Sequence, residues 1–152
     1  MTDASHAMTD ASHAMTDAAY AKPIPDITAD TKPYWDGLKA GRLMLQSCAD
    51  CGRVRHYPRP VCDACWSMRV AWVAASGRAT VHSWTVTHHP FHPGFKPDLP
   101  YALATVDLEE GVRLNAQIRG IDPASLRIGL AVRVGFERAT NNLTLPVILP
   151  AG

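Results

Sequence analysis

Apolar and polar residues alternate along five segments in the second half of the chain. The alternation is strictest from Val112 to Arg119, where every even-numbered residue is apolar and every odd-numbered one is polar. A period of two puts successive side chains on opposite faces of an extended strand, so the pattern predicts strands with one buried face. The five predicted strands are residues 77–88, 101–108, 112–119, 131–138 and 143–149.

Turn-forming residues separate these strands. Residues 109–111 (Glu-Glu-Gly) predict a hairpin between the second and third strands, and the asparagine pair 141–142 predicts a turn between the fourth and fifth. Residues 120–129 predict one short helix, capped at Asp122 and ended by a glycine. Three strands, a helix and two more strands are the order of a five-stranded OB-fold barrel, which we expect over residues 69–152.

The first part of the chain divides into three further regions. Residues 1–22 contain three near copies of the heptad Met-Thr-Asp-Ala-Ser-His-Ala, too polar for a coiled coil or a repeat core. We expect a disordered tail there, in which any of three methionines could start translation. Residues 23–45 predict an extended segment, a short helix that begins at Pro33 and stops at Gly41, and a lead-in strand. Residues 46–68 contain all the cysteines.

The cysteines form two Cys-x-x-Cys pairs separated by ten residues: Cys48 with Cys51, and Cys62 with Cys65. Two intervening residues let both sulfurs of a tight turn point at one centre, and two such turns complete a tetrahedron. Thiolate ligands in fourfold coordination favour zinc, with iron as the main competitor. The sequence therefore predicts one structural zinc ion in a rubredoxin-like ribbon, and a mainly β protein in which a short N-terminal helix and this ribbon precede the barrel.

Charge and hydropathy narrow the classes of partner and compartment. The formal net charge is only +1, no apolar run approaches the ~20 residues that span a bilayer, and the N-terminus does not resemble a signal peptide. We expect a cytoplasmic protein with reduced thiols and no membrane partner. Residues 42–69 contain five arginines and two aspartates, a formal charge of +3. This charge partly balances the −2 charge of a zinc ion bound by four thiolates. His56 is expected to be an ordinary surface or packing residue.

The loop between the first two barrel strands, residues 88–100, contains four prolines and two phenylalanines. Two interpretations remain open. Either Phe91 and Phe95 fold back onto the barrel, or the loop is a contact surface for a partner or ligand, as loops at the mouth of an OB barrel often are. A second metal site formed by the loop histidines is less favoured, because no cysteine or well-placed carboxylate completes it.

No catalytic motif is present in the sequence. There is no nucleophile elbow, phosphate-binding glycine loop or His-Glu-x-x-His, and the metal takes every cysteine. We therefore do not expect the chain to be an enzyme on its own.

Several separated motifs between residues 30 and 150 resemble the zinc-ribbon/OB-fold proteins that accompany thiolases. They are Tyr34-Trp35 with Leu38, the two Cys-x-x-Cys pairs, residues 77–86, Pro93-Gly94-Phe95, residues 120–123, residues 127–132 and Leu145-Pro146. The resemblance implies a noncatalytic accessory subunit that packs on a thiolase-fold acyl-CoA enzyme, namely an acyltransferase, a thiolase or an acyl-CoA aldolase. Such a subunit helps to bind acyl-CoA while its partner supplies the catalytic groups.

Contacts to acyl-CoA or to the partner are expected from cationic groups that bind phosphates and from apolar anchors. The candidates are Arg78, His88, Phe91, Phe95, Lys96, Arg113 and Arg119. The alternative function is a single-stranded nucleic-acid-binding zinc-ribbon OB-fold protein, which needs a basic groove with stacking aromatics. Seven basic residues against six acidic ones over residues 70–152 make nucleic acid the less favoured partner.

Overall fold

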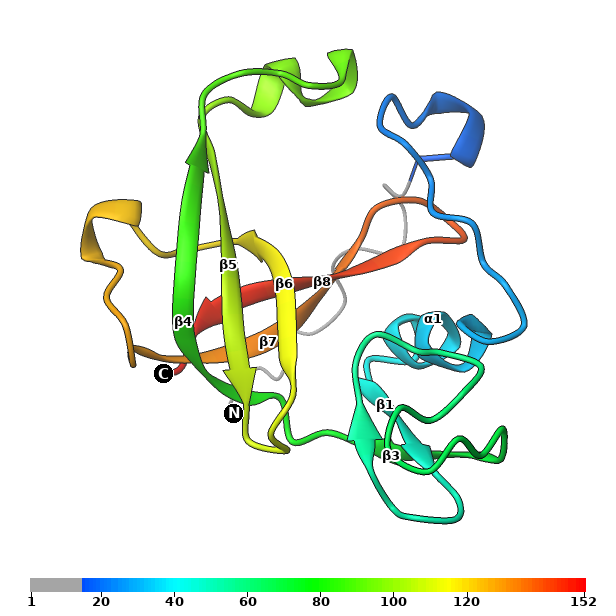
Figure 1. Ribbon diagram of the computed structural model, residues 1–152. Helices are drawn as coiled ribbons and strands as arrows, with labels where there is room; N and C mark the ends of the chain where they lie inside the picture. Colours follow the sequence, from blue (N-terminus) through cyan, green and yellow to red (C-terminus); the bar gives the residue numbers. More distant parts are fainter. Residues whose placement is uncertain (1–14) are drawn as a thin grey trace, which may run out of the picture.

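A three-stranded ribbon and a closed five-stranded barrel lie side by side in the computed structural model, which describes residues 15–152 (Figure 1). The ribbon strands are β1 (Met44–Cys48), β2 (Val54–Arg55) and β3 (Val70–Ala74). The barrel strands are β4 (Arg78–Thr87), β5 (Tyr101–Leu108), β6 (Arg113–Ile118), β7 (Ala131–Arg138) and β8 (Thr144–Pro150). The helix α1 (Lys32–Lys39) and three 3-10 turns, at Asp17–Ala19, Pro93–Asp98 and Pro123–Ser125, complete the elements.

The barrel strands are ordered β4-β5-β6-β8-β7, and β7 pairs back onto β4. Neighbouring strands are antiparallel except β6 and β8, which are parallel over two residue pairs only, Gln117 with Val147 and Ile118 with Ile148. This is OB-fold topology. The predicted fold class is confirmed, and each of the five predicted strands overlaps an observed one by all but one or two residues at either end.

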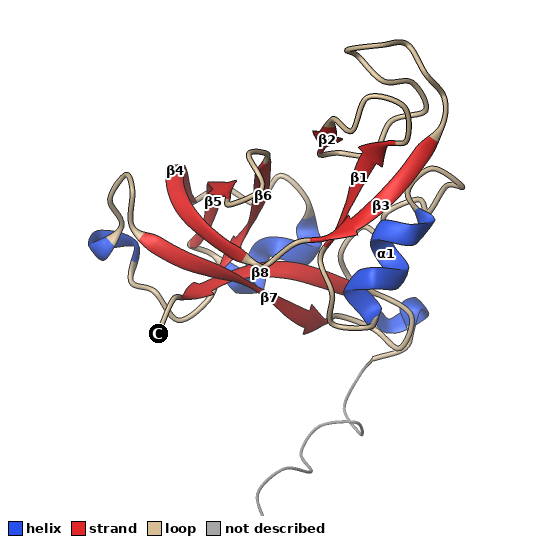
Figure 2. Ribbon diagram, turned by 90° about the horizontal axis from the view of Figure 1, so that it is seen from below, coloured by secondary structure: helices blue, strands red, loops and turns tan. Residues whose placement is uncertain are grey.

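Burial follows the alternation that predicted the strands. In β5, Ala102, Ala104, Val106 and Leu108 are buried and the residues between them are partly exposed. These side chains fill the barrel and contact the same hydrophobic core as α1 and β1. Because one core serves both sheets, the ribbon and the barrel are packed together through the helix, as Figure 2 shows from below.

The helix α1 is confirmed as predicted, with proline in its first turn. It ends before Gly41, whose φ of +72° is the left-handed conformation that glycine adopts without strain. Tyr34 and Leu38 on its buried face pack with Leu43 and Leu45 of the ribbon. Strand β3 pairs with β1 over its whole length and therefore belongs to the ribbon sheet.

The helix predicted within residues 120–129 is only one 3-10 turn, Pro123–Ser125. Asp122 does cap it, because its carboxylate accepts a hydrogen bond from the Ala124 N–H at 2.9 Å. The turn stops where Leu126 enters the core in an extended conformation. Gly129 then donates to the Val81 carbonyl at 2.8 Å, so the rest of the segment is tied to β4 and cannot continue as a helix.

Residues 15–25, which we name the N-terminal strap, lie against the barrel, although the sequence placed residues 15–22 in a disordered tail. Asp17 accepts hydrogen bonds from the side chains of Thr140 and Asn142, and the Met15 carbonyl accepts one from the Asn141 N–H. The first two heptad copies, with Met1 and Met8, lie outside the described residues. None of the helices in residues 15–152 is long and apolar enough to span a bilayer.

Candidate functional site

The four cysteines converge at one end of the ribbon. Their sulfur atoms all lie within 4.8 Å of one another, with Cys48 Sγ 3.5 Å from Cys65 Sγ and Cys51 Sγ 3.7 Å from Cys62 Sγ. Tetrahedral ligands about 2.3 Å from a zinc ion are about 3.8 Å apart, so the observed spacing fits such an ion. The ribbon thus has four cysteines positioned to bind one metal ion, which would cross-link its two tight turns.

Backbone N–H groups in the turns favour the thiolate form of two cysteines. The N–H groups of Cys51 and Asp50 lower the pKa of the Cys48 thiol to about 6, and those of Ala64 and Cys65 lower the pKa of the Cys62 thiol. For Cys65, the Ser67 N–H acts in the lowering direction, but the Cys48 sulfur and the other nearby groups outweigh it and raise the pKa to about 12. Four crowded thiolates therefore need a cation to balance them.

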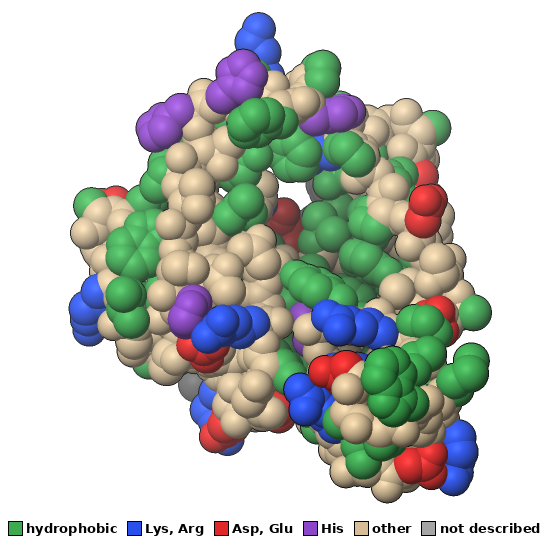
Figure 3. Space-filling view, in the orientation of Figure 1, with side chains coloured by type: hydrophobic (Ala, Val, Ile, Leu, Met, Phe, Trp, Pro, Cys, Tyr) green, Lys and Arg blue, Asp and Glu red, His purple; other side chains and the backbone are tan. Residues whose placement is uncertain are grey.

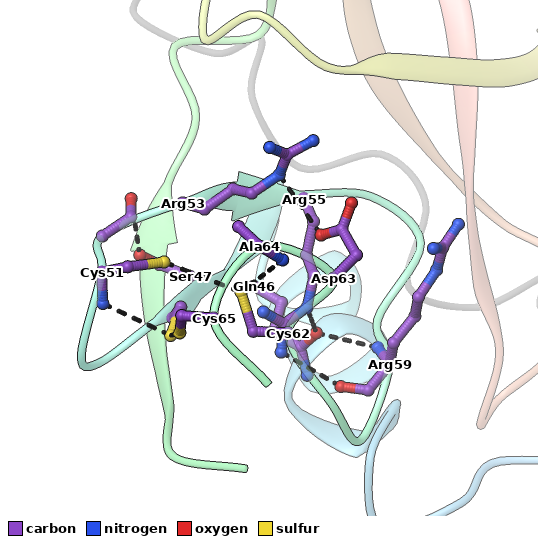
Figure 4. A network of polar contacts seen from close by, with 12 residues as sticks. Gln46, Ser47, Cys51, Arg53, Arg55, Arg59, Cys62, Asp63, Ala64 and Cys65 are labelled. Atoms are coloured by element: carbon purple, nitrogen blue, oxygen red, sulfur yellow. Dashed lines mark hydrogen bonds and ion pairs between the residues drawn. The ribbon is translucent and has the colours of Figure 1, made fainter. Parts of the chain in front are cut away.

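A buried glutamine holds the segment that follows β2. Gln46, on the central ribbon strand, is 1% exposed, and its Oε1 accepts hydrogen bonds from Arg55 Nε at 2.5 Å and from the Arg59 N–H at 2.8 Å (Figure 4). Arg55 also donates through Nη2 to the Arg59 carbonyl at 3.2 Å. These bonds fix residues 55–59 as a short, rigid wall that faces the barrel.

On one side of this wall, an apolar cleft of about 410 Å³ lies between the ribbon, the helix, the strap and the barrel. We name it the aromatic cleft, because its lining includes the six aromatic residues Tyr20, Tyr34, Trp35, Tyr57, Phe95 and Tyr101. Figure 3 shows it as a hollow with hydrophobic side chains on its walls and Lys and Arg side chains between it and the ribbon. Its volume is within the range of ligand-binding pockets.

A small polar cluster belongs to the barrel side of the aromatic cleft. Arg119 donates to the two carboxylate oxygens of Glu137 at 2.8 and 3.1 Å and to Gln117 Oε1 at 2.7 Å. Hydrogen bonds to Glu137 raise the pKa of the arginine further. The cluster is therefore a fixed, internally balanced polar group in an otherwise apolar site.

On the other side of residues 55–59 is a second cavity, of about 420 Å³, between the ribbon and the β5–β6 hairpin. We name it the arginine hollow, since four arginines line it: Arg53, Arg55, Arg59 and Arg113. Two of them are paired, Arg53 with Asp63 at 3.2 Å and Arg113 with Asp107 at 2.8 Å. Among residues 15–152, neither Arg55 nor Arg59 forms an ion pair, and Arg55 Nη1 is buried without a hydrogen-bond partner.

The structure separates the residues that the sequence suggested for ligand or partner contact. Phe95 and Arg119 line the aromatic cleft, and Arg113 lines the arginine hollow beside it. Arg78 lies at another surface, where it pairs with Glu109 at 2.8 Å.

The other three candidates, His88, Phe91 and Lys96, are exposed on the loop and do not line either cavity. Phe95 instead packs on Tyr101, with ring centroids 5.6 Å apart. Thus each of the two interpretations of the loop describes one of its phenylalanines, because Phe95 folds back and Phe91 is 86% exposed. Their roles in binding stay predictions.

Sequence reasoning missed most of the aromatic cleft and all of the arginine hollow except Arg113. Trp35, Tyr57 and Tyr101 come from three distant segments, and no spacing in the sequence brings them together. Arg55 and Arg59 were interpreted as balancing the zinc site, yet no arginine in the described part of the chain donates a hydrogen bond to a cysteine sulfur. A buried polar residue, Gln46, in the strand before the first cysteine was the one available signal.

Comparisons with known proteins agree with this architecture. Residues 35–70 match the family model described as the ChsH2 rubredoxin-like zinc ribbon domain, and residues 72–137 match the model of the ChsH2 C-terminal OB-fold domain. The chain is 36% identical, over 97 residues, to a DUF35 domain-containing scaffold protein of Methanothermobacter thermautotrophicus, covering 63% of this chain and 72% of that protein.

Two further relatives carry names that refer to enzymes. A probable enoyl-CoA hydratase alpha subunit of Thermomonospora curvata is 41% identical over 130 residues, which are 86% of this chain but 40% of that protein. The chain thus spans about two fifths of the length of this relative. A chain of the solved structure described as Ltp2-ChsH2(DUF35) aldolase superposes with a TM-score of 0.78 at 40% identity, covering 85% of this chain and 100% of that chain.

Proposed function

Because the chain belongs to the DUF35 family of zinc-ribbon and OB-fold proteins, we propose that it is a noncatalytic accessory subunit of an acyl-CoA enzyme complex. One observation carries the proposal. The ribbon and barrel match, over the full length of the matched chain, a protein whose description names an aldolase assembly with ChsH2. The hydratase subunit name of the Thermomonospora relative supports the acyl-CoA class. We propose a thiolase-fold enzyme as the partner, in line with the resemblance in the sequence.

The surface of the chain supports a protein partner. Phe91 is 86% exposed on the loop, and Trp66 and Met68 are 79% and 72% exposed on the ribbon. Single exposed apolar side chains are common on protein surfaces, but where they belong to an interface a few of them supply most of the binding energy. In this role a zinc ion on the four cysteines holds the ribbon rigid, and the partner provides the catalytic groups.

Co-expression with a thiolase-fold enzyme from the same organism tests the proposal. We expect the two chains to elute together, and Phe91→Ala to weaken the complex about tenfold or more while zinc content stays at one equivalent. Ile128→Ala is the matched control, because Ile128 is also a large, 77% exposed apolar residue but lies on the β6–β7 connection. It should leave the complex intact.

The opposite result would support the nucleic-acid alternative. A chain that binds single-stranded oligonucleotides at physiological salt, and recruits no acyl-CoA enzyme, would contradict the proposed function. That binding should also weaken steeply with added salt, because it would depend on phosphate neutralisation.

A further inference from the structure

We propose that the arginine hollow and the aromatic cleft form one elongated binding site for an acyl-CoA thioester, with phosphates in the hollow and the acyl end in the cleft. The proposal rests on the proposed function for the class of ligand. It adds the place, the orientation and the residues. No predicted contact other than Phe95, Arg113 and Arg119 lies in this site.

The two cavities share both of their walls. Along β6, Arg113 belongs to the arginine hollow, and Asn115, Gln117 and Arg119 belong to the aromatic cleft. On the opposite wall, Arg55, His56 and Arg59 line the hollow, while Tyr57 and Pro58 line the cleft. The side chains of one short segment thus point into both cavities. The two walls touch at the boundary between the cavities, where the Asn115 N–H donates to the Tyr57 hydroxyl at 3.4 Å, so a ligand that fills both cavities has to displace this long hydrogen bond.

The charge of the hollow suits a multivalent anion. Four arginines against Asp63 and Asp107 leave a formal +2, and burial lowers the pKa of His56 to about 4, so the imidazole adds no charge at neutral pH. Arg55 is only 6% exposed, and its Nη1 is buried without a partner among the described residues. Its guanidinium therefore adds positive charge to the wall of the hollow, while Nη1 itself is closed to solvent.

The Arg59 guanidinium is the second free cation of the hollow. Gln46 fixes the Arg59 backbone, while the exposed side chain has no ion pair in the part of the chain that the structure describes. Arginine presents several donors in a planar fork that matches phosphate geometry. Arg59 can therefore bind a phosphate without breaking the ion pairs of Arg53 and Arg113, and the buried guanidinium of Arg55 adds positive charge behind it.

The aromatic cleft suits an uncharged, apolar group. The Arg119–Glu137 pair is internally neutral, and the aromatic and proline side chains around it offer no further charge apart from Lys22, which pairs with Asp98 at 2.5 Å. From Arg113 to Arg119 the strand advances about 20 Å, at about 3.3 Å per residue. A ligand that fills both cavities thus needs phosphates at one end, an apolar group at the other and an extended linker between them. Acyl-CoA has this construction, with pantetheine as its linker.

Calorimetric titration of the full, zinc-loaded chain tests the site with three probes: octanoyl-CoA, CoA, and S-octanoyl-pantetheine, which lacks the nucleotide phosphates. We expect octanoyl-CoA to bind most tightly. Arg59→Ala should weaken octanoyl-CoA and CoA about tenfold and leave S-octanoyl-pantetheine unchanged. Tyr57→Ala should reduce the advantage of octanoyl-CoA over CoA.

Matched controls separate the site from general effects of charge and apolar surface. Arg42→Ala removes an exposed arginine of the same region outside the hollow, and Ile128→Ala removes an exposed apolar residue outside the cleft. Both should bind all three probes as the unmodified chain does. If Arg59→Ala proves unfolded by circular dichroism, Arg59→Gln keeps the size of the side chain and should show the same selective loss.

Three results would overturn the inference: no binding of octanoyl-CoA, equal losses in Arg59→Ala and Arg42→Ala, or binding of single-stranded oligonucleotides in place of octanoyl-CoA. The first two leave the proposed function standing if the chain still elutes with its enzyme partner. Selective octanoyl-CoA binding without any enzyme partner would support this site and contradict the accessory role.

Discussion

His56 lies between two tyrosine rings, 5.2 Å from Tyr34 and 3.9 Å from Tyr57 by ring centroids, and neither of its buried nitrogens has a hydrogen-bond partner in the described residues. Burial lowers its pKa from 6.5 to about 4. Between these values the unfolded chain takes up a proton that the folded chain does not. Protonation of His56 therefore takes nothing from the free energy of unfolding above pH 6.5, and it lowers this free energy progressively as the pH falls toward 4.

We predict that His56 lowers the free energy of unfolding by about 1 kcal/mol when the pH falls from 7.5 to 5.5, because one pKa unit corresponds to about 1.4 kcal/mol. Urea unfolding at both pH values measures this loss. His56→Phe keeps an aromatic ring in the stack and should lose about 1 kcal/mol less over the same range. Protonation of the zinc ligands affects both proteins equally, so equal losses in the two would contradict the prediction.

For single residues, the sequence predicted the role of a side chain wherever the spacing along the chain alone determines that role. Two Cys-x-x-Cys turns indicate a metal whatever surrounds them, and the sulfurs do converge. The free arginines could not be chosen in the same way, because pairing depends on tertiary neighbours. Arg53 and Arg55 are two residues apart, yet only Arg53 meets an acid, and only Arg55 has a buried donor without a partner.

Among the elements, the N-terminal strap is the one whose role the sequence did not indicate. Its Asp17 binds Thr140 and Asn142, and Tyr20 lines the aromatic cleft. The Ala21 carbonyl lies so close to Gly94 that a Cβ added there would be 2.3 Å away. The strap therefore fits one position on the barrel closely, across two loops that are distant in sequence.

We predict that a chain beginning at Met15 matches the full chain, because it keeps the whole strap. A chain beginning at Lys22 should lose about 1–2 kcal/mol of stability and melt roughly 5 °C lower, since Thr140 and the cleft lose their partners. Thermal unfolding of the two chains measures the difference. Gly94→Ala in the Met15 chain should have a similar effect, and equal melting temperatures for all three would show that the strap contributes nothing.

The strands were predictable as elements because alternation records burial directly, as in β5. The strap was not, because its polar composition matches that of a solvated tail, and its contacts are made by single side chains without any period. The helix expected within 120–129 failed for another reason. Its local signals were correct at Asp122, but the buried Leu126 and the bond from Gly129 to β4 override them.

At the scale of the whole molecule, the stability of the barrel depends on the zinc site, because the ribbon and the barrel share one hydrophobic core. Leu38 and Leu45 pack in the same cluster as the barrel strands, so loosening the ribbon exposes part of the barrel core. The sequence predicted both sheets but not the site between them, because no residue pattern encodes how two separately predicted sheets pack together.

We predict that the purified chain contains one equivalent of zinc. The Cys62→Ser variant should lose both the zinc and the fold of the ribbon. Far-ultraviolet circular dichroism should keep the barrel signal at a lower melting temperature, and octanoyl-CoA binding should disappear, because the ribbon forms one wall of both cavities. Adding a strong chelator to the unmodified chain should have the same result, reversed by zinc. Four freely titrating thiols in a chain purified without chelator would contradict the prediction.

The parallel contact between β6 and β8 has a consequence for motion. It consists of two residue pairs, and it is where the barrel has the fewest ladder hydrogen bonds to hold it closed. Gln117 and Val147, one on each strand of this contact, both line the aromatic cleft. A molecule bound there touches both strands and slows their separation. Amide hydrogen exchange in β6 and β8 would then report whether the cleft is filled, even for a ligand that changes no average structure.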